Sequence, residues 1–222
     1  MERQIQITSD GSQTMAVPEL QITYHSIHGA IQESIHVFIE AGLKPLLKQY
    51  ETIYIFEMGF GTGLNALLSL QQALQSNQKI FYYTVELFPL KPGEYNQLNY
   101  AQQLRDDSLQ FYFLEMHKCE WEKNVPIHSL FTLHKSNESL FNLSTDKLFN
   151  LIYFDAFAPK AQPELWTKEV FEKMFRILEN KGVLVTYCSK GDVRRAMQAV
   201  GFTVHKLKGP PGKREMLRGR KI

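Results

Sequence analysis

The sequence contains few of the residues that build disulfide-linked or metal-bound proteins. Its 222 residues include two cysteines, Cys119 and Cys188, which provide no disulfide framework and no metal-type spacing. The seven histidines form no HExxH motif and no His/Cys cluster. We therefore predict reduced thiols, as is typical of a cytoplasmic protein, and no metal site.

Long apolar runs are also missing. No stretch reaches the roughly 18 consecutive apolar residues that a membrane-spanning helix needs. Residues 1–4 lack the basic start and apolar run of a secretory signal. With 44% hydrophobic and 22% charged residues, the composition is that of one globular domain that can bury a continuous core. We therefore expect a cytoplasmic protein with no membrane partner.

Charge is distributed unevenly, although the net charge is only +2. Residues 190–222 hold ten Lys or Arg residues against two acidic ones, a balance of +8, so residues 1–189 carry −6. A basic segment of this kind is either a solvated end or a surface that meets phosphates, because Lys and Arg contacts drive nucleic-acid association through counterion release. Charge alone leaves both interpretations open.

From about residue 50, short apolar stretches alternate with helical ones, which is typical of an α/β sheet. Strands are expected at residues 52–56, 80–85, 130–133, 149–154 and 183–187. Helices are expected after residue 63 and at 92–104, 164–178 and 191–200, while residues 106–125 are harder to interpret and are consistent with an irregular helix.

The C-terminal part predicts a hairpin, because residues 202–207 and 214–217 flank a Gly-Pro-Pro-Gly turn at 209–212. The expected fold is therefore α/β and Rossmann-like: a mostly parallel sheet closed by a C-terminal antiparallel hairpin. We expect one globular domain over residues 51–222 and a small N-terminal extension or cap over residues 1–50.

The glycine loop after the first strand carries the cofactor signal. Glu57-x-Gly59-x-Gly61-x-Gly63 follows a strand and opens a helix, where glycines allow a tight turn and a close ligand. A dinucleotide fold instead has G-x-G-x-x-G with the pyrophosphate on the helix N-terminus. An acid before the loop would repel a pyrophosphate but suits the cationic methionine end of S-adenosylmethionine (SAM). Glu86, at the end of the second strand, is placed to accept ribose hydroxyls.

Asp155 ends the fourth strand, at the edge where open α/β sheets bind ligands. Methyl transfer from a sulfonium to an amine is an in-line displacement that depends mainly on proximity and orientation. A carboxylate beside the sulfonium can take a proton from the amine or steer it. We predict that Asp155 is catalytic, and the alternative is an Asp that caps the following turn.

Several stretches resemble the methyltransferase domain of the MnmC family and its stand-alone form, MnmD. They are the glycine loop at 57–65, Phe154-Asp155-Ala156-Phe157-Ala158-Pro159-Lys160 with 163–167, Val193-Arg194-Arg195 with 199–202, and Gly212-Lys213-Arg214-Glu215-Met216-Leu217. The resemblance spans about residues 20–220, and its Asp-x-Phe-x-Pro and Lys-Arg-Glu-Met pieces are more specific than a glycine loop. It implies a class I SAM-dependent methyltransferase.

The resemblance also implies a substrate. The family methylates the exocyclic amine of 5-aminomethyl-(2-thio)uridine at the wobble position, in the anticodon region of tRNA, to give the methylaminomethyl form. Since the sequence leaves no room for a flavin domain after the hairpin, we expect the methyl-transfer step alone, after another enzyme has made the amine. An extruded base would be held by stacking on aromatic side chains.

These expectations assign residues to three roles. Asp155 is the expected catalytic residue. The expected cofactor-binding residues are Glu57, Gly59, Phe60, Gly61, Gly63, Asn65, Glu86, Asn137 and Asp155. The expected substrate or tRNA contacts are Phe157, Pro159, Lys160, Trp166, Arg194, Arg195, Lys213 and Arg214, although Trp166 is equally well explained as core and each basic residue as a surface charge.

One position departs from the family. Many SAM folds, this family included, have an acid near the adenine amine just after the third strand, where this chain has Ser136 or Asn137, with Glu138 a little further on. Asn137 can still bond the adenine.

Three other functions fit parts of the pattern. A SAM methyltransferase acting on a small-molecule amine or a protein is disfavoured by the basic hairpin. A non-catalytic SAM-fold scaffold is disfavoured by the presence of both Glu57 and Asp155. A nicotinamide oxidoreductase is disfavoured by the glycine spacing.

Overall fold

The most apolar strand lies at the centre of the sheet. In this computed structural model, which describes residues 2–222, every residue of β8 (Phe149–Phe154) is buried. β8 pairs in parallel with β4 (Thr52–Met58) on one side and with β9 (Leu178–Thr186) on the other. A strand that is covered on both faces needs apolar side chains on both, which explains the uninterrupted run of buried residues.

The eight-stranded sheet has the order β10-β11-β9-β8-β4-β5-β7-β6. β5 (Lys79–Val85) and β7 (Phe131–Ser136) extend the parallel part, and β10 (Thr203–Lys208) and β11 (Glu215–Arg220) form the antiparallel hairpin. The prediction of a mostly parallel sheet closed by a hairpin is therefore confirmed. The sequence did not reveal β6 (Asn124–His128), an antiparallel edge strand where Pro126 is tolerated because an edge needs fewer backbone donors.

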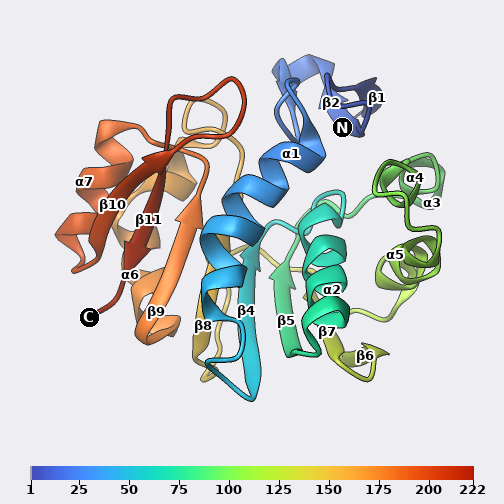
Figure 1. The fold of residues 1–222 in the computed structure, drawn as a ribbon. Helices are drawn as coiled ribbons and strands as arrows, with labels where there is room; N and C mark the ends of the chain where they lie inside the picture. Colours follow the sequence, from blue (N-terminus) through green and yellow to red (C-terminus); the bar gives the residue numbers. More distant parts are fainter. Residues whose placement is uncertain (1) are drawn as a thin grey trace.

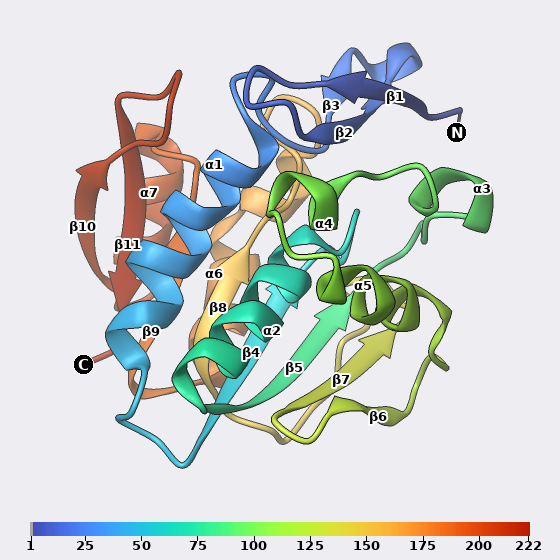
Figure 2. The same cartoon turned by 45° about the vertical axis from the view of Figure 1, so that its right-hand side comes forward.

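Helices cover both faces of this sheet (Figures 1 and 2). Side chains alternate between the two faces along each strand, so that Ile53 and Ile55 enter one core while Phe56 enters the other. The first face carries α2 (Leu64–Ser76), η2 (Ile35–Leu43) and α5 (Ser108–Lys118), and the second carries α6 (Lys168–Ile177) and α7 (Gly191–Ala199).

Two predicted helices are wrong in part. Residues 92–104 form two short helices, α3 (Pro92–Tyr95) and α4 (Tyr100–Gln103), rather than one. The break lies at Asn99, whose side chain accepts from Gln13 N at 2.9 Å and donates to Gly11 O at 3.0 Å, so tertiary contacts hold the interruption. Residues 164–178 begin as a 3-10 turn, η4 (Pro163–Trp166), and Leu178 already belongs to β9.

The N-terminal residues form a small sheet of β1 (Gln4–Ile7), β2 (Gln13–Val17) and β3 (Ile22–Thr23). The short η1 (Pro18–Leu20) connects β2 to β3, and α1 (Ala30–Ser34) follows the sheet. Figure 2 shows this sheet above the carboxyl ends of the central strands. α1 continues into η2, which packs on the central sheet: a Cβ added at Gly42 would lie 3.0 Å from Val185 Cγ2. The expected boundary near residue 50 stays a prediction. No helix in residues 2–222 is long and apolar enough to cross a membrane.

Candidate active site

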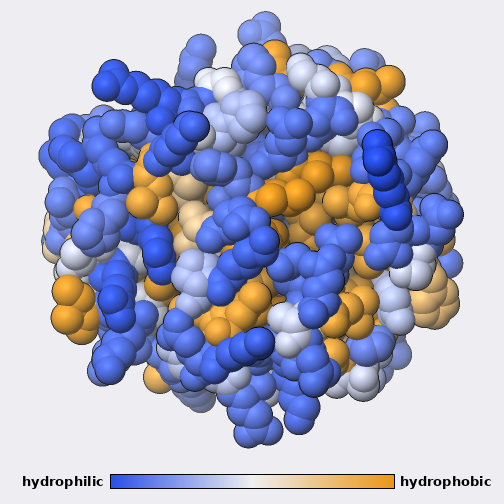
Figure 3. All heavy atoms as spheres, in the orientation of Figure 1, coloured by the Kyte–Doolittle hydropathy of each residue, from blue (hydrophilic) through white to orange (hydrophobic). Residues whose placement is uncertain are grey.

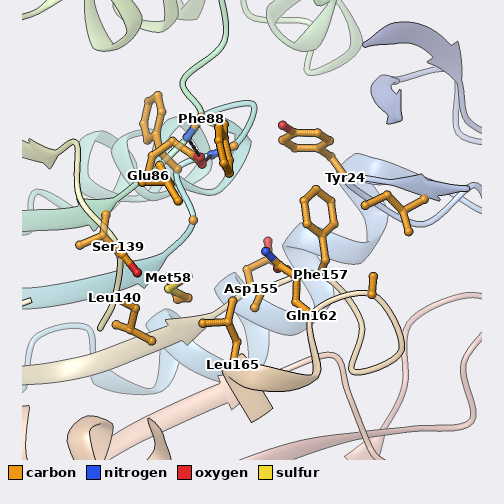
Figure 4. Close-up of a pocket in the computed structure, with 18 of the residues that line it drawn as sticks. Tyr24, Met58, Glu86, Phe88, Ser139, Leu140, Asp155, Phe157, Gln162 and Leu165 are labelled. Carbon is orange, nitrogen blue, oxygen red and sulfur yellow. Dashed lines mark hydrogen bonds between the residues drawn. The ribbon is translucent and has the colours of Figure 1, made fainter. Parts of the chain in front are cut away.

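A cavity of about 260 Å³ lies at the carboxyl ends of β4, β5 and β8 (Figure 4), and Leu20, Ile22 and Tyr24 of the N-terminal segment also line it. On the face seen in Figure 3, apolar side chains gather between α1, α2 and α4 and are surrounded by hydrophilic ones. Seven of the predicted site residues line the cavity. They are Gly59, Phe60, Gly61, Asn65, Glu86, Asp155 and Phe157.

The glycine loop adopts the backbone conformation that its sequence requires. Gly61 and Gly63 have φ of +53° and +76°, values that L side chains rarely adopt. Gly61 also lies under Tyr24, because an added Cβ would be 3.2 Å from the ring atom Cδ1. The loop therefore combines a left-handed turn with a close approach of the N-terminal segment.

The side-chain amide of Asn65 bridges two carboxyl groups. Its Nδ2 donates to Glu57 Oε1 at 3.0 Å and to Asp155 Oδ2 at 2.8 Å. Glu57 is only 1% exposed, and burial together with nearby Asp155 raises its pKa well above its usual range. Asn65 Oδ1 is buried and has no hydrogen-bond partner within residues 2–222, so this acceptor fits a donor group of a bound ligand.

The Asp155 carboxyl group has a pKa near neutral pH. Burial, followed by the negative charge of Glu33, raises its pKa from 3.8 to about 7, and the Asn65 hydrogen bond and Lys213 only partly oppose this. A carboxyl group with such a pKa can accept and release a proton at physiological pH. The position at the end of β8 thus has the proton affinity that a general base needs.

Glu86 links the glycine loop to the segment after β5. Its Oε2 accepts from Gly61 N at 2.9 Å, and its Oε1 accepts from Phe88 N at 2.8 Å. A carboxylate offers about four acceptor positions, so two remain for hydroxyl donors of a ligand. Glu86 can therefore brace the loop and bind a ribose at once.

We expect Glu86→Ala to weaken SAM binding substantially. Each lost charged hydrogen bond is worth roughly 1.5–3 kcal/mol, and the variant also removes the acceptor of Gly61 N–H. Calorimetric titration with SAM measures the effect, with Glu51→Ala as a control, since Glu51 is an exposed carboxylate just before β4, at the end of the sheet opposite the cavity. Unchanged affinity of Glu86→Ala would exclude Glu86 as a cofactor ligand.

The cavity is lined by four acidic side chains. They are Glu86, Glu138, Asp155 and Glu164. Within residues 2–222, no Lys or Arg lines it, and burial lowers the pKa of the lining residue His25 to about 4, so His25 is neutral. Such a site attracts a cation and repels a pyrophosphate. It therefore fits the sulfonium and ammonium groups of SAM and disfavours a nicotinamide dinucleotide.

Sequence reasoning missed an aromatic residue of the site. Tyr24 contacts Phe157 edge to face, with ring centroids 5.0 Å apart, and both rings line the cavity (Figure 4). Phe157 is held in turn by Gln162, whose Oε1 accepts from Phe157 N at 3.1 Å. Tyr24 belongs to a short irregular segment without a motif, so no local pattern signals its approach to the glycine loop.

Four of the predicted cofactor and substrate residues lie behind the cavity or at its edge. Glu57 is buried and accepts from Asn65 Nδ2, and Gly63 ends the loop at the start of α2. Trp166 is buried, and its indole N–H donates to Phe157 O at 2.8 Å. Asn137 is exposed and donates from Nδ2 to Glu86 O at 2.7 Å, whereas the polar residues of this segment that line the cavity are Glu138 and Ser139. An adenine contact by Asn137 stays a prediction.

Apart from Phe157, the predicted substrate or tRNA contacts do not line the cavity. Lys160 and half-buried Pro159 lie in the turn after β8, with Lys160 exposed. Arg194 and Arg195 lie near the start of α7, which follows β9 at the same edge of the sheet, and Arg195 pairs with Asp192. Lys213 and Arg214 lie in the turn between β10 and β11.

Lys213 differs from the other predicted basic contacts because its partner is a buried carboxylate. It forms an ion pair with Glu33, while Arg214 is exposed. Residues 2–222 contain no group of three or more His, Cys, Asp or Glu side chains arranged to hold a metal ion.

Comparisons with known proteins agree with this geometry. Residues 100–222 match the family model described as S-adenosyl-L-methionine-dependent methyltransferase. The tRNA 5-methylaminomethyl-2-thiouridine biosynthesis bifunctional protein MnmC from Pseudoalteromonas atlantica is 32% identical to this chain. The match covers 97% of this chain and 33% of that protein. The Magnetococcus marinus protein of the same name is also 32% identical, covering 89% and 31%. The chain thus spans about a third of these relatives, and the expected resemblance to MnmC is confirmed.

Solved structures support the fold. The crystal structure of MNMC2 from Aquifex aeolicus superposes with a TM-score of 0.81 at 24% identity, covering 98% of this chain and 69% of the other. Spermidine synthase from Thermotoga maritima gives a TM-score of 0.52 at 14% identity, covering 99% and 68%. With the acidic cavity and the family match over residues 100–222, these observations show that SAM is the cofactor and that the chain belongs to the S-adenosyl-L-methionine-dependent methyltransferase family.

Proposed function

We propose that this protein transfers the methyl group of SAM to the exocyclic amine of 5-aminomethyl-(2-thio)uridine at the wobble position of tRNA. The observation that carries the proposal is Asp155, a carboxyl group at the end of β8 with a pKa of about 7, inside an acidic cavity. The substrate follows from the similarity to the MnmC proteins.

The charges of the cavity suit this substrate. An alkylammonium group is mostly protonated at neutral pH and must lose a proton before its lone pair can attack. Asp155 can attract the ammonium group and accept that proton, with Asn65 holding one of its oxygens. SAM, when bound, supplies an activated methyl group on its sulfonium, so the protein contributes mainly orientation and proton removal.

The aromatic pair suits a nucleobase. Tyr24 and Phe157 present ring surfaces to the cavity, and burial raises the pKa of Tyr24 to about 12, so its hydroxyl stays protonated and can donate. Bases taken out of an RNA loop are commonly held by stacking on such rings. The exposed basic residues at the same edge, Lys160, Arg195 and Arg214, are suited to the phosphates around the extruded nucleotide.

The test is methyl transfer from labelled SAM to bulk tRNA from cells that lack this gene, with mass spectrometry of the nucleosides. We expect 5-aminomethyluridine or its 2-thio form to fall as the methylaminomethyl form rises. If SAM binds but no tRNA nucleoside gains a methyl group, the substrate lies among small amines or proteins and the proposal is wrong.

Tyr24 gives a residue-level test of base holding. We expect Tyr24→Ala to raise the KM for tRNA by about 5- to 150-fold, because a stacked base is worth about 1–3 kcal/mol, while SAM affinity changes little. Tyr24→Phe keeps the ring and should retain most of the activity. If Tyr24→Ala and Tyr24→Phe lose activity equally, the hydroxyl rather than the ring is what matters.

A further inference from the structure

The two ends of the chain meet beside the active site. Glu33, in α1 and only 5% exposed, pairs with Lys213, in the turn between β10 and β11. The other carboxylate oxygen of Glu33 accepts from Ser26 N at 2.7 Å. His36 Nε2 lies 2.7 Å from the carbonyl oxygen of Lys208, so the two segments contact each other at more than one point. The hairpin turn is therefore fixed against α1 and η2.

The ion pair connects to Asp155 through Tyr187. Lys213 Nζ lies 3.9 Å from the centroid of the Tyr187 ring, within the range of a cation–π contact. The Tyr187 hydroxyl donates to the carbonyl oxygen of Ala156 at 2.8 Å. Ala156 follows Asp155 in the chain, so a continuous series of contacts runs from the buried pair to the backbone of the catalytic aspartate.

We propose that Glu33 and Lys213 are positioning residues for methyl transfer, which fix the Tyr187–Ala156 contact and influence the electric field at the Asp155 carboxyl group. The proposal rests on the function proposed above for Asp155. It gives Lys213 a task other than the phosphate contact that the sequence predicts. Moving its ammonium to a phosphate would leave the carboxylate of Glu33 buried without its cation, which is costly.

The two charges act on Asp155 in opposite directions. The negative charge of Glu33 raises the pKa of Asp155, and the positive charge of Lys213 lowers it. The other polar groups around Asp155 include Asn65, which donates to it, and Glu57, which shares that amide. The hydroxyl groups of Tyr82 and Tyr187 also interact with its charge, and burial raises the pKa of Tyr82 well above its usual range. Burial raises the pKa of Tyr187 well above its usual range, so it stays neutral while Asp155 titrates.

Because the two charges shift the pKa of Asp155 in opposite directions, replacing each of them should have opposite effects. A merely structural role of the pair would not produce this result. Lys213→Met should move the titration midpoint of the Asp155 carboxyl to higher pH, and Glu33→Gln should move it to lower pH, each by about half a pH unit or more. The double variant should lie between them. Carbon-13 NMR of the labelled aspartate carboxyl, assigned with Asp155→Asn, measures the midpoint without SAM or tRNA.

The pH profile of kcat/KM for tRNA should move in the same two directions. Lys206→Met is the matched control, since Lys206 lies on the same hairpin and pairs with Glu215 at 2.7 Å. It should move neither midpoint. Lys213→Arg keeps the charge and should restore the wild-type midpoint.

Three outcomes would overturn the proposal. The first is that neither substitution moves the NMR midpoint, and the second is that both move it in the same direction, as a general loosening would. The third is that Lys213→Met moves no midpoint but raises the KM for tRNA and weakens the salt dependence of tRNA binding, which would indicate a phosphate contact. Since the NMR titration needs no substrate, a failure of tRNA methylation refutes the proposed function without deciding the role of this pair.

Discussion

Replacing Asp155 with Asn is expected to lower kcat by about 10²–10⁴-fold, the usual contribution of a positioned general base, while SAM affinity changes little. The amide oxygen of the new side chain can still accept from Asn65 Nδ2, which lies 2.8 Å from Asp155 Oδ2, so the local geometry is preserved. What the variant loses is the negative charge and the ability to take a proton from the substrate ammonium.

The pH dependence follows from the pKa of about 7. A base must be deprotonated to act, so wild-type kcat/KM should fall as the pH falls through about 7. The residual activity of Asp155→Asn should lack this part of the profile. Single-turnover rates and calorimetric SAM titrations across pH 5.5–8.5 measure both quantities.

Asp146→Asn provides the matched control, because Asp146 is exposed in the loop before β8 and should behave as wild type. Equal losses of SAM binding and turnover in Asp155→Asn would show that this aspartate serves the cofactor rather than proton removal.

The sequence was sufficient to predict most of the sheet and the cofactor loop, because both depend on local patterns. β8 matches the predicted strand at residues 149–154, since continuous apolar runs and a following acid are visible in the chain itself. The glycine loop was recognisable for the same reason: left-handed turns at Gly61 and Gly63 require glycine at those positions.

The rest of the site depends on contacts between distant residues. Tyr24 reaches Phe157 across more than a hundred positions, and Glu33 meets Lys213 across 180. Neither Tyr24 nor Glu33 lies in a motif whose spacing indicates the partner. Lys213 shows most clearly what local sequence does not predict. A basic residue in a basic segment predicts a phosphate contact, whereas the partner of Lys213 is a buried carboxylate from the N-terminal part of the chain.

The Asp155 carboxyl group, which we propose as the general base, should also destabilise the fold at neutral pH. The pKa of Asp155 is raised from 3.8 to about 7 in the folded protein, so between these values the folded chain binds more protons than the unfolded chain. The free energy of unfolding must then fall as the pH rises from about 4 through 7. In Asp155→Asn this pH-dependent decrease in the free energy of unfolding should be absent, because the amide does not ionise.

We therefore expect Asp155→Asn, without SAM, to be more stable than wild type above pH 7, by up to about 4 kcal/mol for a shift of about three pKa units. The advantage should shrink as the pH falls and vanish near pH 4. Urea unfolding of wild type, Asp155→Asn and Asp146→Asn at several pH values measures it. An advantage that is the same at every pH would reflect packing rather than charge, and a variant less stable than wild type at pH 8 would mean that its neighbours stabilise the Asp155 carboxylate. In that last case the pKa of Asp155 would lie below its ordinary value, and the residue would be too weak a base to deprotonate the substrate.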